Sequence, residues 1–169
     1  RPLNTTLQLR LQEQMGQLSL QVSRDSVPEL LRLGVEASAS AIGYQLRLLD
    51  TFALNDRRWQ VVEDHQVRVD TGTVVVERVT LRQGAQELWV DGNLAGSLLL
   101  RLRALEIGPL SDLAGIAGYD LAGKISGESK LMQLSGQPYY LADLEVDSIA
   151  LNQERIGELS LSAETSQDG

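Results

Sequence analysis

The residue types that could do chemistry are few, and they do not form a catalytic set. The single histidine, His65, follows Glu63 and Asp64, so that a carboxylate could orient its ring for acid–base work. Such a site needs a partner, either a cysteine, a second histidine or a serine in a strained elbow turn. The chain has no cysteine and no other histidine. We therefore expect a solvated turn at His65, no metal site and no enzymatic activity.

The segment Gly118–Lys124 has most of the spacing of a phosphate-binding loop. Such a loop requires Ser or Thr after the lysine to reach magnesium, and a long helix behind it. Here Ile125 follows the lysine, Asp120 would repel phosphate, and no long helical pattern comes next. We interpret the segment as an amphipathic strand with Leu121 and Ile125 pointing inward.

Two further motifs carry little chemistry. Asn4-Thr5-Thr6 matches the sequence pattern of an N-glycosylation site, and this pattern is short enough to arise by chance. The pair Tyr139–Tyr140 has two interpretations. It could stack on a sugar, or it could start a strand and fill the edge of a core.

Composition narrows the class of protein. The chain has 169 residues and a net charge of −8, with acids and bases scattered, and this pattern disfavours a nucleic-acid partner. Hydrophobic residues make up 43% and aromatic residues only 4%, so Leu, Val, Ile and Ala must line whatever is buried. Apolar runs such as Leu98–Leu100 are far short of the ~20 residues of a membrane-spanning helix. No methionine opens the chain, and we expect residues 1–169 to be a single β-rich repeat segment of a longer protein.

Hydrophobic periodicity predicts strands over most of the chain. Leucines alternate with polar residues from Thr5 to Gln12 and from Gly16 to Ser23, and the same period of two recurs up to Ala163. Small residues alternate in the same way from Gly34 to Ala41. A hairpin of one design occurs three times, beginning with Leu9–Leu20 and followed by two similar units, Val79–Val90 and Ile149–Leu161.

Two short helices and one irregularity interrupt this pattern. Ser26–Glu29 has the spacing of a capping box and Gly34 that of a helix stop, which predicts about two helical turns. Pro109–Gly115 repeats the same proline-to-glycine spacing and predicts a second helix. The alternation changes phase between Val76 and Val79, which indicates a β-bulge. Neither helix is long enough to cross a sheet, so we expect an all-β fold.

Periodicity leaves two architectures open. The apolar residues could fill a closed sandwich of two facing sheets, or one long sheet could curl and leave its apolar lining open for lipid. Scarce aromatics, a strand lined with alanines and hairpins of one design favour the curled sheet. Its groove would be lined by Leu7, Leu9, Leu11, Leu18, Leu20, Val79, Leu81, Leu98, Leu100, Leu102, Leu144, Val146, Ile149, Leu151, Leu159 and Leu161.

The segment Leu121–Ala163 resembles the repeats of the TamB family, which is part of the wider AsmA-like group of envelope proteins. The connector from Leu102 to Leu113 is also similar to the short-helix connector of this family, whereas the strand Val35–Ala41 departs from its pattern. The matching spacings are Leu121-x-Gly123-x-Ile125-Ser-Gly127, Leu134-Ser-Gly136-x-Pro138, Leu144, Ile149-x-Leu151-Asn152 and Ile156-Gly157-x-Leu159-x-Leu161-x-Ala163.

This resemblance implies a β-taco, an elongated half-pipe with an apolar interior, in a parent protein that is anchored in the inner membrane of a Gram-negative bacterium and spans the periplasm. It implies phospholipid transport between the inner and outer membranes. It also implies support of outer-membrane protein assembly with a barrel partner of the TamA type. The expected partners are phospholipid acyl chains, that barrel and unfolded outer-membrane protein strands, and no cofactor is expected.

Two alternatives from other functional classes remain. In the first, the segment is a scaffold whose open sheet edges, Thr5–Gln12 and Leu159–Glu164, accept a client strand. In the second, it is a closed β-sandwich that binds carbohydrate through Tyr139 and Tyr140.

Overall fold

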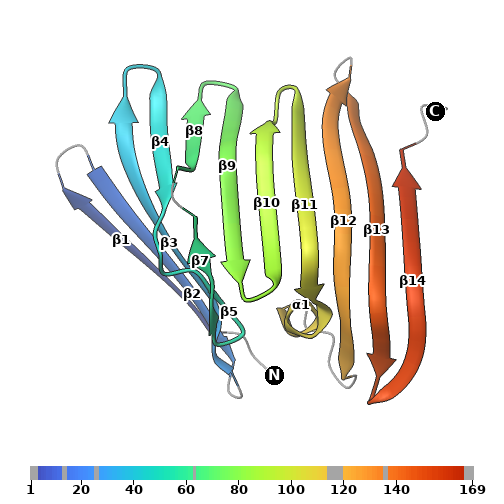
Figure 1. Cartoon of the computed structure of the whole chain (residues 1–169). Helices are drawn as coiled ribbons and strands as arrows, with labels where there is room; N and C mark the ends of the chain where they lie inside the picture. The colour runs from blue at the N-terminus through green and yellow to red at the C-terminus, as the bar shows by residue number, and fades with distance from the viewer. Residues whose placement is uncertain are drawn as a thin grey trace.

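The described residues form one open antiparallel β-sheet. The computed structural model describes residues 4–12, 15–24, 27–62, 64–113, 120–134 and 137–165. Their 14 strands belong to a single sheet, and long strands that follow one another in sequence lie side by side (Figure 1). The expected all-β fold is confirmed. The alternative of two facing sheets is not formed by this part of the chain.

The path across the sheet runs from one open edge, β1, to the other, β14. In spatial order its strands are β1 (Asn4–Gln12), β2 (Met15–Arg24), β3 (Val27–Ser40), β4 (Gly43–Leu48), β8 (Gln66–Asp70), β9 (Thr73–Gln83), β10 (Gln86–Asn93), β11 (Ser97–Glu106), β12 (Leu121–Leu134), β13 (Gln137–Leu151) and β14 (Glu154–Glu164).

Three short strands complete the sheet where β4 ends early. They are β5 (Ala53–Leu54), β6 (Arg57–Arg58) and β7 (Gln60–Val61). β5 pairs with β3 and β6, while β7 pairs with β9, so this insert links the same two long strands that β4 and β8 link nearer the other end. Phe52 and Trp59 meet edge to face within the insert, with ring centroids 6.3 Å apart.

The three hairpins predicted from repeated sequence are all present. Leu9 lies opposite Leu18 in β1–β2, and Val79 lies opposite Val90 in β9–β10. In β13–β14, Leu151 lies opposite Glu154, and both intervening residues, 152 and 153, have positive φ. Two such residues are what a tight hairpin turn of the type I′ class requires.

The helix predicted from Ser26 to Gly34 is wrong. Ser26 lies outside the described residues, and Val27–Ser40 forms the strand β3, which pairs with β2 and then with β4 and β5. A helix of two turns is too short to be stable alone, whereas β2 offers a full row of backbone partners. Instead of a capping box, the Glu29 N–H donates to the Asp56 carboxylate, and the Glu29 side chain pairs with Arg32.

The second predicted helix is confirmed, with its start two residues earlier. Helix α1 (Ile107–Leu113) follows β11 directly, and it contacts both β12 and β3. A Cβ on Gly123 would lie 3.2 Å from the Ile107 Cδ1 atom, so this glycine allows α1 to approach β12 closely. Among the described residues, α1 is the only helix.

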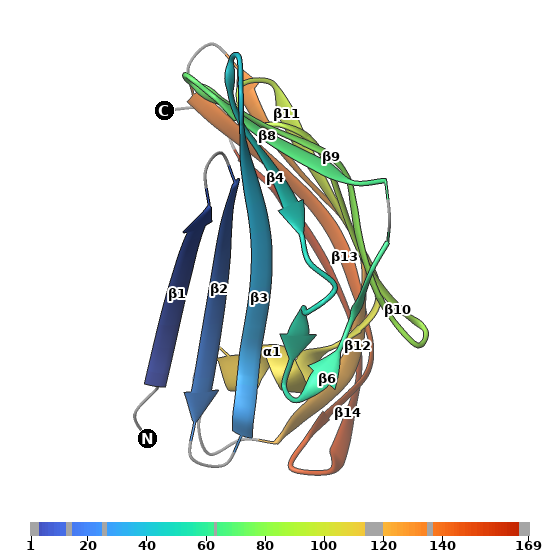
Figure 2. The same ribbon diagram turned by 90° about the vertical axis from the view of Figure 1, so that its left-hand side faces the viewer.

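Bulges bend the second half of the sheet. The register shifts at Arg78 in β9, Ala104 in β11 and Ser148 in β13, and all three residues have positive φ. The shift at Arg78 confirms the bulge predicted between Val76 and Val79. The backbone N–H of Arg78 donates to Asp91, and that of Ala104 donates to Ser126, so these two bulges are held by the next strand. Figure 2 shows the resulting curve, with β1–β3 standing apart from β9–β14 and α1 between them near one end.

Candidate lipid-binding face

Cross-strand register sets which side chains share a face of the sheet. Residues that lie directly opposite each other on antiparallel strands project to the same side. Leu9 lies opposite Leu18, Leu18 opposite Val35, and Val35 opposite Leu48. The same reasoning continues strand by strand through the bulges to β14. We call the side defined in this way the apolar face.

All of the apolar residues predicted to line a groove lie on this face. Near one edge it carries the three leucines of β1, and near the other edge Leu144 lies opposite Leu161. In the middle, Leu81 lies opposite Leu88, and Leu88 lies opposite Leu102. The members predicted from sequence are Leu7, Leu9, Leu11, Leu18, Leu20, Val79, Leu81, Leu98, Leu100, Leu102, Leu144, Val146, Ile149, Leu151, Leu159 and Leu161.

The predicted list of groove residues left out further members of the same face. Register adds Leu33, Val35, Leu46, Leu48, Val67, Val69, Val74, Val76, Leu88, Val90, Leu121, Ile125 and Leu131. For Leu121 and Ile125 this agrees with the inward orientation predicted from the sequence. Ser129 is a polar residue in the middle of a strand on this face, while Thr5, Gln83 and Glu154 lie at strand ends.

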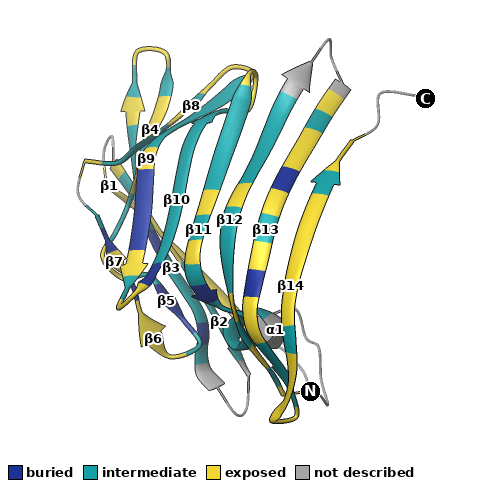
Figure 3. Cartoon of the chain, turned by 45° about the vertical axis from the view of Figure 1, so that its right-hand side comes forward, coloured by how far each residue is buried: buried dark blue, intermediate teal, exposed yellow. Residues whose placement is uncertain are grey.

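The apolar face is covered only in part. A buried cluster forms where the insert and α1 pack on the sheet, and its members are Leu54, Trp59, Val61, Leu81 and Leu105. Leu81 is 6% exposed, whereas Leu9 near one edge is 62% exposed and Leu161 near the other is 49% exposed. Figure 3 shows the same contrast between β9 and β14. Large aliphatic side chains therefore remain in contact with solvent at both ends of the strand order.

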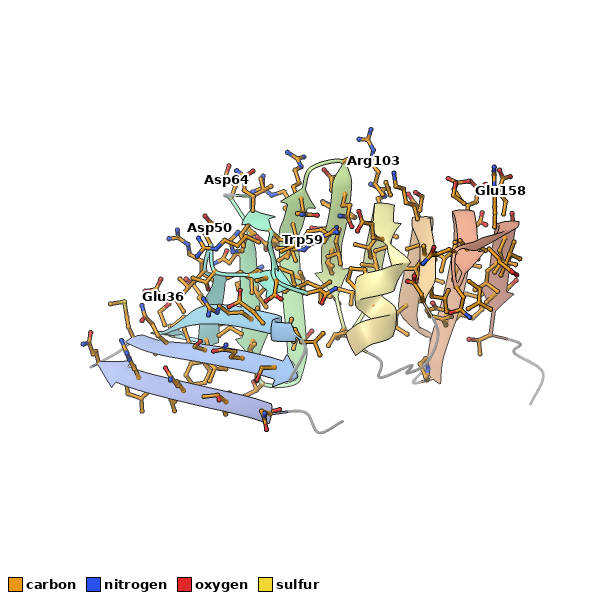
Figure 4. The ribbon with its side chains drawn as sticks, turned by 90° about the horizontal axis from the view of Figure 1, so that it is seen from below. Glu36, Asp50, Trp59, Asp64, Arg103 and Glu158 are labelled. Atoms are coloured by element: carbon orange, nitrogen blue, oxygen red, sulfur yellow. The ribbon has the colours of Figure 1, made fainter. Side chains whose placement is uncertain are left out.

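The opposite face is polar and carries cross-strand ion pairs. Arg82 pairs with Glu87 at 2.6 Å, and Arg101 pairs with Glu128 at 2.6 Å. The Arg101 guanidinium also lies 4.8 Å from the ring centroid of Trp89. In Figure 4 the labelled side chains of Glu36, Arg103 and Glu158 lie along the outer margin of the curve, and α1 lies on its other side. The two faces of the sheet thus differ sharply in chemistry.

His65 has a structural role. Its Nε2 atom accepts a hydrogen bond from the Leu48 N–H at 3.0 Å, and its Nδ1–H donates to the Val62 carbonyl at 2.9 Å. Both bonds together require the neutral ring with its proton on Nδ1. The imidazole therefore joins the end of β4 to the residue after β7 and is half-buried, not solvated as predicted. Asp64 is exposed, and Glu63 lies outside the described residues.

Tyr139 and Tyr140 lie on opposite faces and do not form a platform. Tyr140 lies opposite Leu131 and shares the apolar face, whereas the Tyr139 hydroxyl donates a hydrogen bond to Glu164 on the polar face. This hydrogen bond raises the pKa of Tyr139 above its ordinary value because it favours the protonated phenol, and desolvation and the charge of Glu164 act in the same direction.

The remaining candidate motifs are explained by the sheet. Leu121 and Ile125 lie in β12 on the apolar face, in agreement with a strand instead of a phosphate-binding loop, while Gly118 lies outside the described residues. No cluster of His, Asp and Glu residues suitable for a metal ion occurs in the described ranges. Within the same ranges, no helix has the length and apolar character needed to cross a bilayer.

Comparisons with protein-family models, with curated proteins and with solved structures found no match in any of the three. The functional argument therefore rests on the two faces of the sheet.

Proposed function

We propose that the apolar face binds the acyl chains of phospholipids and lets them move along the strand order. One observation carries this proposal: a single open sheet places nearly all of its Leu, Val and Ile residues on one side, and those residues remain exposed toward both edges. Monomeric soluble proteins rarely leave large apolar patches open unless they contact a ligand, a partner or a membrane. The curved sheet would then act as a half-pipe with an apolar interior.

The physics of the side chains suits a sliding ligand. Each methylene group that leaves water gains about 0.8 kcal/mol, so an acyl chain of ordinary length would bind firmly. Aliphatic contacts have no directional preference, and one stretch of leucines is therefore nearly equivalent to the next. Strands lie about 4.8 Å apart, and the hydrocarbon of one leaflet is about 15 Å thick, so one acyl chain would overlie about three strands.

The cellular setting is part of the proposal. The resemblance of Leu121–Ala163 to TamB repeats supports a periplasmic location, in a parent anchored in the inner membrane of a Gram-negative bacterium. In that setting the segment would carry phospholipid between the two membranes. It would support outer-membrane protein assembly together with a barrel partner of the TamA type. None of these roles requires catalysis by the segment.

Of the two alternatives, the strand scaffold keeps structural support, because every residue of the edge strand β1 is exposed. The carbohydrate-binding sandwich loses its basis, since the sheet is single and Tyr139 and Tyr140 point to opposite sides.

Lipid extraction tests the proposal directly. The chain would be purified from bacterial cells, extracted with organic solvent and examined by mass spectrometry, and in parallel it would be titrated with a fluorescent phospholipid analogue. We expect co-purified phospholipid and saturable binding of the analogue. A chain that carries no lipid and binds no analogue would contradict the proposal, whether or not it pairs with strands of other proteins.

A further inference from the structure

We infer that the β1 edge of one chain pairs with the β1 edge of a second copy, in antiparallel register centred on Gln8. This inference goes beyond lipid binding, because it concerns how two copies of the chain associate through a backbone edge.

The first step is the direction of the backbone groups in β1. Gln12 lies opposite Met15, and two residues separate them in the sequence. Because the pair that flanks a two-residue hairpin connection is normally hydrogen-bonded, we infer that Gln12 and Met15 form such a pair. The backbone groups of every second residue, including Arg10 and Gln8, therefore point toward β2. The N–H and C=O groups of Thr5, Leu7, Leu9 and Leu11 point to the open edge, where they have no strand beside them among the described residues.

The second step is the lack of edge protection in β1. Natural sheets guard their edges with charges, prolines, bulges or short strands. β1 has nine residues, all of them exposed, with one charge, Arg10, no proline and an unbroken register to β2. The other edge, β14, carries Glu154, Glu158 and Glu164, and its register to β13 shifts twice. β1 is thus the edge that accepts a strand most readily.

The third step is the fit of β1 to itself. An antiparallel register centred on Gln8 pairs all nine residues and places Leu7 opposite Leu9 of the second copy. On the polar face it places Thr6 opposite Arg10 and Gln8 opposite its own counterpart, so no like charges meet. The corresponding self-pairing of β14, centred on Leu159, would place Glu154 opposite Glu164 twice. Pairing through β1 also keeps the leucines of both copies on one side, which makes the apolar face continuous across the dimer.

Introducing a negative or a positive charge at Gln8 tests this register. Because Gln8 meets its own counterpart in a pair without hydrogen bonds, where side chains are closest, Gln8→Glu and Gln8→Lys would each place like charges together. Sedimentation over a concentration series should show a dimer of the unchanged chain. In each variant the dissociation constant of the dimer should rise about 5-fold or more. In an equimolar mixture of the two variants, the carboxylate of Gln8→Glu in one copy meets the ammonium group of Gln8→Lys in the other, and the dissociation constant should return to that of the unchanged chain.

Two further variants sharpen the result. Thr6→Glu should lower the dissociation constant about 5-fold, since each copy then offers a carboxylate to Arg10 of the other. Gln45→Glu, the same chemical change as Gln8→Glu on the polar face of an inner strand, should leave it unchanged. A chain that is monomeric at every concentration would overturn the inference, and so would a dimer insensitive to charge at Gln8, as expected if apolar faces stack. Phospholipid binding by the Gln8 variants should equal that of the unchanged chain, which separates this inference from the proposed function.

Discussion

At the scale of single residues, the position of a leucine on the sheet matters more than its type. Leu161 and Leu141 have similar exposure, 49% and 40%, yet register places Leu161 on the apolar face and Leu141 on the polar face. Only the first belongs to the proposed lipid surface. Alternation in the sequence revealed most of these sides, because successive strand residues point to opposite faces.

Replacement of Leu161 by Glu should weaken phospholipid binding about tenfold or more, because the change removes a leucine contact worth about 1.5 kcal/mol or more and adds a charge. Fluorescence titration with a lipid analogue would measure the affinity. Ser160→Glu adds the same charge one residue away on the polar face and should have little effect. Equal losses in both variants would argue against binding at the apolar face.

His65→Ala should lower the free energy of unfolding by about 2 kcal/mol, because the Leu48 N–H and the Val62 carbonyl both lose their partner in a half-buried position. Chemical denaturation would measure the change. Asp64→Asn, at an exposed neighbour that already has positive φ, is the matched control and should be close to neutral. A fully stable His65→Ala variant would show that the ring does not join these segments. The sequence indicated only a polar turn here, since Leu48 lies 17 residues from His65 and alternation does not predict that the two meet.

Because Tyr139 donates a hydrogen bond to Glu164, we expect its hydroxyl to ionise at a higher pH than that of an ordinary tyrosine. Because the folded-state pKa of Tyr139 is raised, its contribution to stability is present below the unfolded pKa, about 10, and is lost as the pH rises through the folded value. Ultraviolet absorbance would follow ionisation in single-tyrosine variants. Glu164→Gln should return the pKa of Tyr139 toward its ordinary value, and an unchanged titration curve would refute the assigned cause.

At the scale of elements, the sequence indicated most of the strands. It did not show where pairing with a neighbouring strand would prevail over a local helical pattern. Val27–Leu31 has apolar spacing that suits a short helix, but the side of β2 was free, and pairing with a neighbouring strand decided the outcome. Of the insert, the strand predicted at Trp59–Val62 is confirmed as β7, whereas β5 and β6 were missed, since strands of two residues have no periodicity of their own. Bulges were visible only where the alternation changed phase, as at Val76–Val79.

Glycines in the strands beside the bulges should tolerate no side chain. Gly127 has a φ of 135°, and a Cβ there would lie 2.2 Å from the Asp143 carbonyl oxygen. Gly127→Ala should therefore destabilise the fold by about 3 kcal/mol or more in thermal or chemical unfolding. Gly84, with a φ of 60° in an open turn, meets nothing, and Gly84→Ala should cost about 1–2 kcal/mol. Similar losses at both positions would contradict the claim that the Asp143 backbone lies too close to Gly127 for a side chain.

At the scale of the whole molecule, the account depends on an apolar face that stays accessible. The insert and α1 cover it around the cluster that contains Trp59 and Leu105, and both edges of the sheet remain open. Sequence periodicity predicted one apolar side for most of the long strands. It could not decide whether a second layer would cover that side, because a buried strand and an uncovered one have the same alternation.

The most direct measurement is methyl NMR of the chain with a phospholipid that carries a spin label on its acyl chain. Leucine methyl groups report on both faces at once, since Leu99 and Leu141 lie on the polar face and provide internal controls. We expect strong paramagnetic broadening for leucines of the apolar face, including Leu9 and Leu161, and little for the two controls. Equal broadening of both groups, or none in either, would contradict the proposal that this face binds acyl chains.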